Sequence, residues 1–101
     1  LDDALIKGNY EHNTGIQIVN YFTEKGLNPN EIEMILIGNH GPFCWAKDAG
    51  NAVYNARVLE EIAHMAYLTL QINPAAKRLK DSLIKKHYER KHGDEAYYGQ
   101  E

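Results

Sequence analysis

The chain has 101 residues, of which 44% are hydrophobic and 25% charged, and its formal net charge is −3. This composition is typical of a globular domain, and the negative charge excludes a general affinity for nucleic acids or anionic membranes. No apolar run reaches the length of a membrane span, no secretory signal pattern is visible, and Cys44 has no second cysteine to pair with, so we expect a cytoplasmic protein.

The first predicted element is a helix that follows an opening without a hydrophobic pattern, residues 1–10. Asn13 or Thr14 is expected as its N-cap, and Gly26 lies just beyond its end. Pro29, between two asparagines, then marks a connector. The apolar positions of this helix recur at helical spacing and are Ile16, Val19, Tyr21 and Phe22.

Two short apolar runs predict a β-hairpin. Residues 32–38 (IEMILIG) are apolar on both faces from Met34 onward, which is typical of a strand covered on two sides. Residues 43–47 (FCWAK) provide a second strand, so residues 38–42 are expected to form the turn. The other four residues of the turn already supply its backbone chemistry, so His40 must be explained by packing or by function.

Two helices are predicted after the hairpin. The first begins after Asp48, a natural N-cap, and ends near Pro74. The second is expected from about Ala76 to His92, with Gly93 as its terminator. The apolar stripe of the first helix contains Ala52, Val53, Ala56, Leu59, Ile62, Ala63 and Ala66, of which Leu59 and Ile62 should face the sheet. One side of the second helix carries Leu79, Leu83, Ile84, His87 and Tyr88.

This order of helix, strand, strand, helix and helix cannot close a stable sheet, because two strands are too few. The long helix also has more apolar positions than the chain can cover. We therefore expect the missing neighbours to come from elsewhere in the same protein or from partner subunits. The chain starts with Leu1 rather than Met, and we expect it to be a part of a larger protein.

A basic segment lies near the end of the chain. Residues 77–92 carry seven Lys or Arg against two acidic residues, Asp81 and Glu89. Two interpretations fit this segment: a solvated basic helix face, or an anion site for phosphate. A nucleic-acid site fits less well, because the basic residues are not interleaved with aromatic stacking platforms.

The histidine of the turn also has two interpretations. His40 can be a hydrogen-bonded structural residue, which is the commoner role, or a metal ligand. A catalytic zinc needs about three protein ligands and an open position. His87 and His92 are about 140° apart around a helix, and the chain contains no HxxxH or HxH pair. If His40 binds a metal, its other ligands are expected outside this chain.

Three stretches together resemble one enzyme family. GNHGPFCWAKDAGNAVYNARVLEEIAHMA (residues 38–66) and KHYERKHGDEAYYGQ (residues 86–100) resemble the class II, zinc-dependent sugar-phosphate aldolase/epimerase superfamily. YEHNTGIQIVNYF (residues 10–22) resembles the helix that precedes the hairpin in that family. The HGPF turn followed by VLEE marks the superfamily, and the tail resembles its L-ribulose-5-phosphate 4-epimerase branch.

The resemblance implies a fold and an activity. The fold is α/β, with a mostly antiparallel central sheet flanked by helices, and residues 1–101 would be the C-terminal part of a single domain. The implied activity is the zinc-dependent interconversion of L-ribulose 5-phosphate and D-xylulose 5-phosphate, through cleavage and re-formation of the C3–C4 bond. It would serve pentose catabolism, in the use of arabinose or ascorbate, and the enzyme would be a homotetramer with sites shared between subunits.

The resemblance also assigns roles to four residues. His40 maps onto the third zinc ligand, and Tyr98 onto a catalytic acid/base that reaches into a neighbouring subunit's site. His87 and Arg90 map onto residues near that site, with a catalytic and a substrate-binding role. The family's His-x-His pair, phosphate-binding loop and opposing aspartate are absent here, so we do not expect this chain to turn over substrate alone. Without the resemblance, Tyr98 would be interpreted as an aromatic anchor that packs on a partner.

Two alternatives stay open. One is a class II aldolase that acts on another sugar phosphate, such as a fuculose or rhamnulose phosphate. The other is a non-catalytic helical interaction module that keeps the fold but not the site. Upstream sequence without the paired histidines and the aspartate would favour the interaction module.

Overall fold

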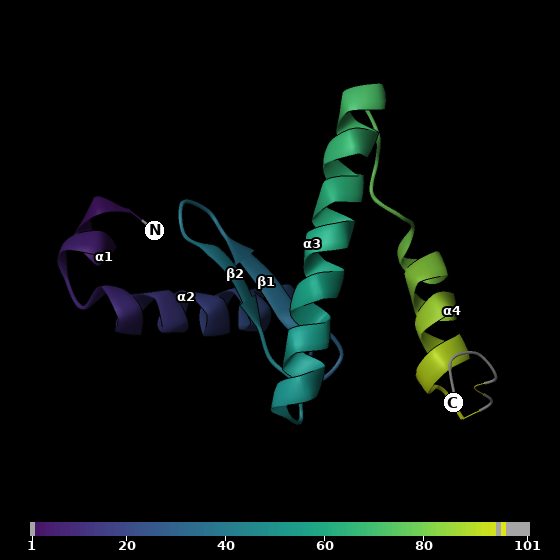
Figure 1. Ribbon diagram of the computed structural model, residues 1–101, viewed down its shortest axis with the longest axis horizontal. Coiled ribbons are helices and arrows are strands. Elements are labelled where there is room, and N and C mark those ends of the chain that lie inside the picture. Colours follow the sequence, from purple (N-terminus) through teal and green to yellow (C-terminus); the bar gives the residue numbers. More distant parts are fainter. Residues whose placement is uncertain (1, 95, 97–101) are drawn as a thin grey trace. The chain divides into compact units, whose positions relative to one another are not determined.

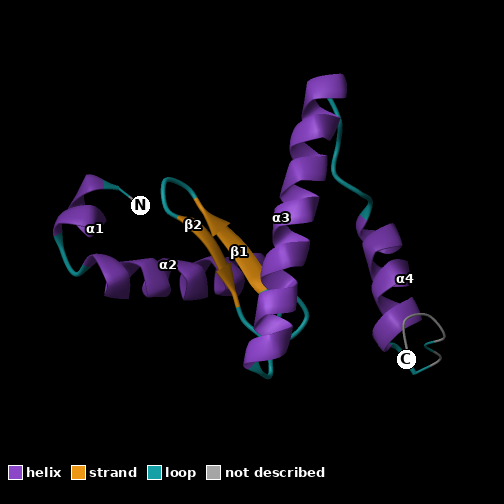
Figure 2. Cartoon of the chain, viewed as in Figure 1, coloured by secondary structure: helices purple, strands orange, loops and turns teal. Residues whose placement is uncertain are grey.

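The computed structural model describes residues 2–94 and 96 (Figure 1). Within these residues the elements are α1 (Asp3–Lys7), α2 (Tyr10–Lys25), β1 (Met34–Ile37), β2 (Gly41–Cys44), α3 (Ala49–Ile72) and α4 (Asp81–His92) (Figure 2). The predicted succession of helix, hairpin and two helices is confirmed, and α1 is an addition to it. The chain divides into two compact units, residues 1–67 and residues 68–101, with the boundary inside α3.

The helix α2 begins earlier than the sequence predicted. Its N-cap is Asn9, whereas Asn13 and Thr14, the two expected N-caps, lie inside the helix, so that prediction was wrong. Asn13 Nδ2 donates to the carbonyl of Leu5 over 3.0 Å, and Thr14 Oγ1 donates to the carbonyl of Tyr10 over 2.8 Å. Both side chains therefore satisfy their hydrogen bonds without capping the helix, which is an established alternative for Asn and Thr.

Two other helix boundaries lie where the sequence predicted them. Gly26 ends α2 in the left-handed conformation with φ 63°, and its N–H bonds to carbonyls of the last turn. Asp48 precedes α3, and its carboxylate accepts hydrogen bonds of 2.8 Å from both the backbone N–H and the side chain of Asn51. These bonds lower the pKa of Asp48. Its capping contribution is therefore present above the ordinary pKa and is lost as the pH falls through the folded-state value.

The hairpin is tighter than predicted. Its two strands pair antiparallel, and Ile37 lies opposite Gly41, so the turn consists of residues 38–40. The expected turn, residues 38–42, was two residues too long, because Gly41 and Pro42 belong to β2. Pro42 has no N–H to donate, which an edge strand tolerates. The second strand thus starts and ends earlier than expected.

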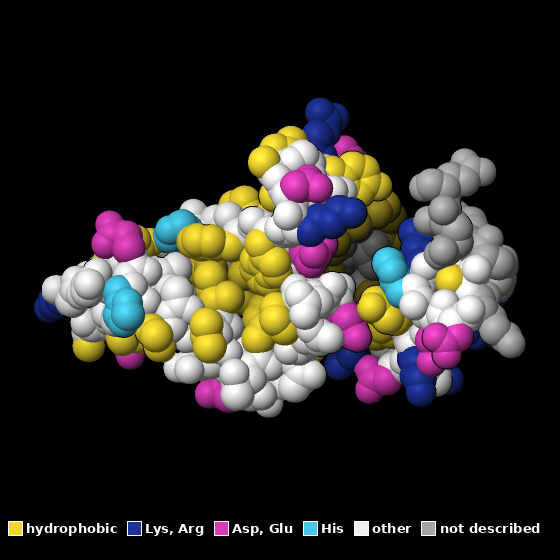
Figure 3. All heavy atoms as spheres, turned by 90° about the horizontal axis from the view of Figure 1, so that it is seen from below, with side chains coloured by type: hydrophobic (Ala, Val, Ile, Leu, Met, Phe, Trp, Pro, Cys, Tyr) yellow, Lys and Arg dark blue, Asp and Glu magenta, His cyan; other side chains and the backbone are white. Residues whose placement is uncertain are grey.

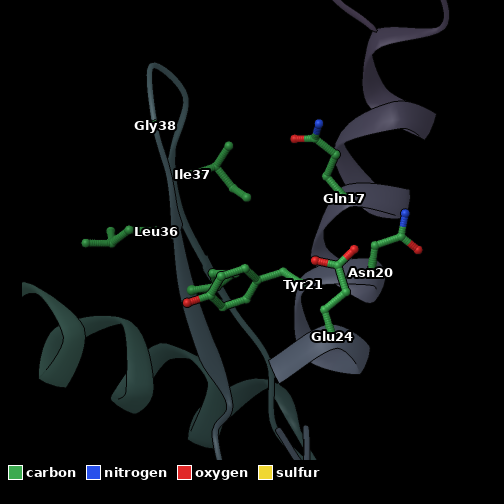
Figure 4. A pocket seen from close by; sticks show the side chains of 8 residues that line it. Gln17, Asn20, Tyr21, Glu24, Leu36, Ile37 and Gly38 are labelled. Carbon is green, nitrogen blue, oxygen red and sulfur yellow. The ribbon is translucent and has the colours of Figure 1, made fainter. Parts of the chain in front are cut away.

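The two faces of the hairpin meet different helices. Figure 4 shows the side chain of Ile37 pointing toward α2 and that of Leu36 pointing the opposite way, as alternation along a strand requires. On that opposite side Leu36 and Leu59 of α3 line one pocket. Leu36 is nevertheless 57% exposed. The strand is therefore covered more completely on the α2 side than on the α3 side.

A small core holds the first unit together. Among the described residues, Phe22 and Leu59 are the buried hydrophobic ones, each 7% exposed. The ring of Phe22 meets that of Trp45 edge to face, with 5.5 Å between the centroids. Asn55 Nδ2 of α3 donates to Glu33 Oε2 over 2.9 Å and to the carbonyl of Trp45 over 3.0 Å. These contacts fix both α2 and α3 to the base of the hairpin.

Much apolar surface stays uncovered. Leu59 is buried as predicted, but Ile62, also expected to face the sheet, is 42% exposed, because a two-stranded hairpin is too narrow to cover a helix of 24 residues. On the face shown in Figure 3, hydrophobic side chains form a broad yellow patch. Further exposed apolar residues of α3 are Val53, Tyr54, Met65, Tyr67, Leu68, Leu70 and Ile72. Among the described residues, α3 therefore keeps uncovered apolar side chains, as the sequence predicted.

The last helix starts later than expected. α4 begins at Asp81 rather than Ala76, and Lys80, whose backbone is extended, is its N-cap. A turn at Asn73 ends the preceding helical segment. The side chain of Asn73 accepts the N–H of Ala75 over 3.1 Å, and its carbonyl accepts the N–H of Ala76 over 3.0 Å. No residue of α4 is buried.

Across the described part of the chain, no helix combines the length and apolar character needed to cross a membrane.

The burial of Leu59 makes a prediction about stability. In the full-length protein, Leu59→Ala should lower the free energy of unfolding by about 2–5 kcal/mol, because it removes a buried side chain and leaves a cavity. Urea unfolding at a fixed protein concentration measures this change. The neighbouring exposed Glu60→Ala is the control and should change the free energy by less than about 0.5 kcal/mol. A loss for Leu59→Ala well below 1 kcal/mol would show that this position is not in the core.

Candidate functional site

The backbone of the hairpin turn fixes the position of His40. The N–H of His40 donates to the carbonyl of Ile37 over 3.0 Å, which closes a four-residue turn. Asn39, the third residue of that turn, has a φ of 61°, and asparagine adopts this left-handed conformation more readily than most residues. Gly41 follows with a φ of 146°, where a side chain would be strained. Asn39 and Gly41 therefore meet the conformational needs of the turn. The turn does not require a histidine at position 40.

The ring of His40 makes two aromatic contacts. It stacks on Tyr10 of α2 with 5.8 Å between the centroids and 29° between the planes, and it lies 4.9 Å from the ring of Phe43 in β2. His40 itself is exposed. The sequence interpretation missed Tyr10, because nothing local links the start of a helix to a distant turn. The one available signal was that Tyr10 opens the YEHNTGIQIVNYF stretch.

The described residues supply only part of what a catalytic zinc site requires. His40 offers an exposed imidazole with a constrained ring, which suits one ligand position. Within residues 2–94 and 96, however, no three His, Cys, Asp or Glu side chains come together as a metal site would need. The described residues thus fit one ligand of a zinc site and do not complete it. That the remaining ligands lie outside this chain stays a prediction.

The other predicted site residues belong to the end of the chain. His87 and Arg90 lie on α4, where a spacing of three residues puts them on one face of the helix. Both are exposed. Lys85 pairs with Glu89 at 3.8 Å on this helix, whereas the described residues provide no ion pair for Arg90. His40 belongs to the first unit and these two residues to the second. Tyr98, the predicted acid/base, lies outside the described residues.

A pocket that the sequence did not predict lies between α2 and β1. Its volume is about 490 Å³, and Gly38 of the turn lines one end of it. Figure 4 shows the polar side chains of Gln17, Asn20 and Glu24 along α2, with the ring of Tyr21 extending toward the strand. The pocket is therefore polar on its helix side and apolar on its strand side. None of the predicted site residues lines it.

More than half of the chain matches a known protein family. The family described as Class II Aldolase and Adducin N-terminal domain matches residues 7–67, which contain α2, the hairpin with His40 and most of α3. The chain belongs to this family. The predicted class II aldolase relationship is thereby confirmed, and the helices with a small antiparallel sheet fit a part of such an α/β fold.

Curated relatives of this class II aldolase family member extend the match to its last residues. It is 46% identical to the L-ribulose-5-phosphate 4-epimerase UlaF of Salmonella paratyphi B over 100 aligned residues. The aligned residues make up 99% of this chain and 43% of that protein. The chain is 44% identical over 102 residues to the probable L-ribulose-5-phosphate 4-epimerase UlaF of Mycoplasma pneumoniae, covering 100% of this chain and 42% of that protein. The predicted resemblance to these epimerases is confirmed. The chain spans less than half the length of these relatives.

Proposed function

We propose that the protein to which this chain belongs is an L-ribulose-5-phosphate 4-epimerase, an isomerase that interconverts L-ribulose 5-phosphate and D-xylulose 5-phosphate. One observation carries this proposal: the 46% identity to an epimerase covers 99% of the chain. The match therefore extends past residue 67, where the family match ends, and includes the basic helix and tail. We further propose that residues 1–101 are the C-terminal part of a single domain.

The substrate dictates the type of chemistry. The carbon that changes configuration, C4, is not adjacent to the C2 carbonyl, so simple loss of its hydrogen would not be stabilised. Instead, a base takes the proton of the C4 hydroxyl, the C3–C4 bond breaks, and its electron pair stays with the three-carbon fragment. The resulting aldehyde turns its other face, C3 attacks it, and an acid returns a proton to the new C4 oxygen. One acid/base group is therefore needed on each face of the aldehyde.

The residues of this chain have distinct parts in that scheme. His40 would hold zinc as one of its ligands, and the exposed, ring-stacked imidazole supports this role. When bound, the metal supplies Lewis-acid stabilisation of negative charge on substrate oxygens. Tyr98 would act as one of the two acid/base groups. His87 would assist catalysis beside it, and Arg90 would bind the substrate phosphate, for which an exposed guanidinium is suited.

The proposed enzyme is a cytoplasmic homotetramer with sites shared between subunits. The extensive exposed apolar surface of α3 supports an assembly in which other protein surfaces cover it. No residue of the basic helix α4 is buried, so its cationic side chains are accessible to another subunit. This accessibility supports a site shared between subunits. The single cysteine is compatible with a reducing compartment.

A substrate comparison tests the proposed function. The full-length protein with zinc is incubated with L-ribulose 5-phosphate, and in parallel with L-fuculose 1-phosphate, and the products are followed by NMR. We expect D-xylulose 5-phosphate from the first and no reaction of the second. In D₂O no deuterium should enter C4, because the C4–H bond is never broken. Release of free aldehyde as the main product would instead identify an aldolase, and deuterium at C4 would exclude cleavage of the C3–C4 bond.

A further inference from the structure

We propose that Tyr10 is a positioning residue for the metal-binding imidazole of His40, an inference that rests on the proposed function. The two rings stack with 5.8 Å between centroids and 29° between planes, within the range of favourable aromatic pairs. Phe43 contacts the same imidazole, but it belongs to the HGPF motif itself. Tyr10 comes from a different element, and none of the roles assigned above includes it.

Tyr10 is itself held in place. It is the first residue of α2 and is half-buried, and its carbonyl accepts the hydroxyl of Thr14 over 2.8 Å. Thr14 is 3% exposed, the lowest value among the described residues. This part-buried hydrogen bond links the first turn of the helix that presents the tyrosine ring to a buried residue.

The exposed position of His40 explains why such support is needed. The turn hydrogen bond fixes the backbone of His40, but it leaves the two side-chain torsions free. A metal ligand that must be ordered on binding loses affinity, and residues that orient a ligand commonly raise metal affinity. Stacking on the half-buried tyrosine restricts the imidazole before the metal arrives. The contact needs the aromatic ring of Tyr10 and not its hydroxyl group.

That distinction defines the variants. Tyr10→Phe keeps the ring, whereas Tyr10→Leu and Tyr10→Met fill similar space without one. In the full-length protein, we expect the two ring-free variants to bind zinc about 2- to 10-fold more weakly, and Tyr10→Phe to bind it like the wild type. Added zinc should restore their kcat, while the KM for L-ribulose 5-phosphate stays unchanged. The exposed neighbour on α2, Glu11→Gln, is the control and should alter none of these values.

Two readouts separate positioning from general destabilisation. Far-UV circular dichroism identifies which of the two ring-free variants folds, and zinc affinity is measured on that variant. The absorption spectrum of bound Co²⁺ reports ligand geometry without any turnover, and it should change in the ring-free variants but not in Tyr10→Phe. Wild-type zinc affinity and an unchanged Co²⁺ spectrum in a folded ring-free variant would overturn the inference. A wild-type protein that binds no zinc would overturn the proposed function instead.

Discussion

Replacing His40 with alanine in the full-length protein is expected to abolish zinc binding and to lower the epimerase rate roughly 10³-fold or more. A catalytic zinc is held by about three protein ligands, so the loss of one imidazole removes a large share of its binding. The fold should persist, because His40 is exposed and lies in a turn whose closing hydrogen bond comes from its backbone. Elemental analysis of the purified variant measures the zinc, and far-UV circular dichroism checks the fold.

The matched control for this experiment is His12→Ala. His12 is another exposed histidine, and it lies on α2. It should keep its zinc and its rate, which would show that removing a surface imidazole has no general effect. Full zinc occupancy in His40→Ala would contradict the assignment of His40 as a ligand, whatever its rate.

Mixing two inactive variants is expected to restore activity if Tyr98 completes the site of a neighbouring subunit. In the proposed roles, Tyr98→Phe lacks an acid/base but keeps the metal ligand, whereas His40→Ala keeps the tyrosine but lacks the ligand. Each variant on its own should be nearly inactive. In a random mixture of equal amounts, about one quarter of the sites pair an intact metal ligand with an intact tyrosine from the next subunit. The mixture should therefore recover about one quarter of the wild-type rate per site.

The alternative for Tyr98 gives the opposite result. If the tyrosine served its own subunit, every subunit in the mixture would lack one essential group, and mixing would restore nothing. Subunit exchange is verified by native mass spectrometry of differently labelled variants. Each variant mixed with itself provides the baseline rate. Demonstrated exchange without recovery would exclude a site shared between subunits.

The parts of the fold that local chemistry decides could be predicted from the sequence. Asp48 caps α3 through its carboxylate, and Gly26 ends α2 because its backbone readily adopts the left-handed conformation. Both effects act within a few residues. The start of α2 could not be predicted in the same way. Asn13 has the chemistry of an N-cap, and only its contact with the carbonyl of Leu5 in the preceding helix shows that it is used differently.

The site shows the same division between local and distant information. His40 stood out because its turn had no conformational need for a histidine. Its stacking partner Tyr10 could not be inferred, because that contact depends on how α2 and the hairpin pack. The burial of Leu59 was predicted from periodicity, but the exposure of Ile62 was not, since periodicity identifies an apolar face without revealing how much of it is covered.

The two-stranded sheet has a practical consequence for work with this polypeptide. β1 and β2 pair with each other, and among the described residues no further strand covers their outer edges. Unpaired N–H and C=O groups along a strand edge are templates for pairing with other chains, which leads to aggregation. Leu36 and the exposed side chains of α3 add apolar surface on which other chains can associate. Residues 1–101 expressed as an isolated polypeptide are therefore poorly suited to biophysical work, and low solubility of that polypeptide would carry no information about the full-length protein.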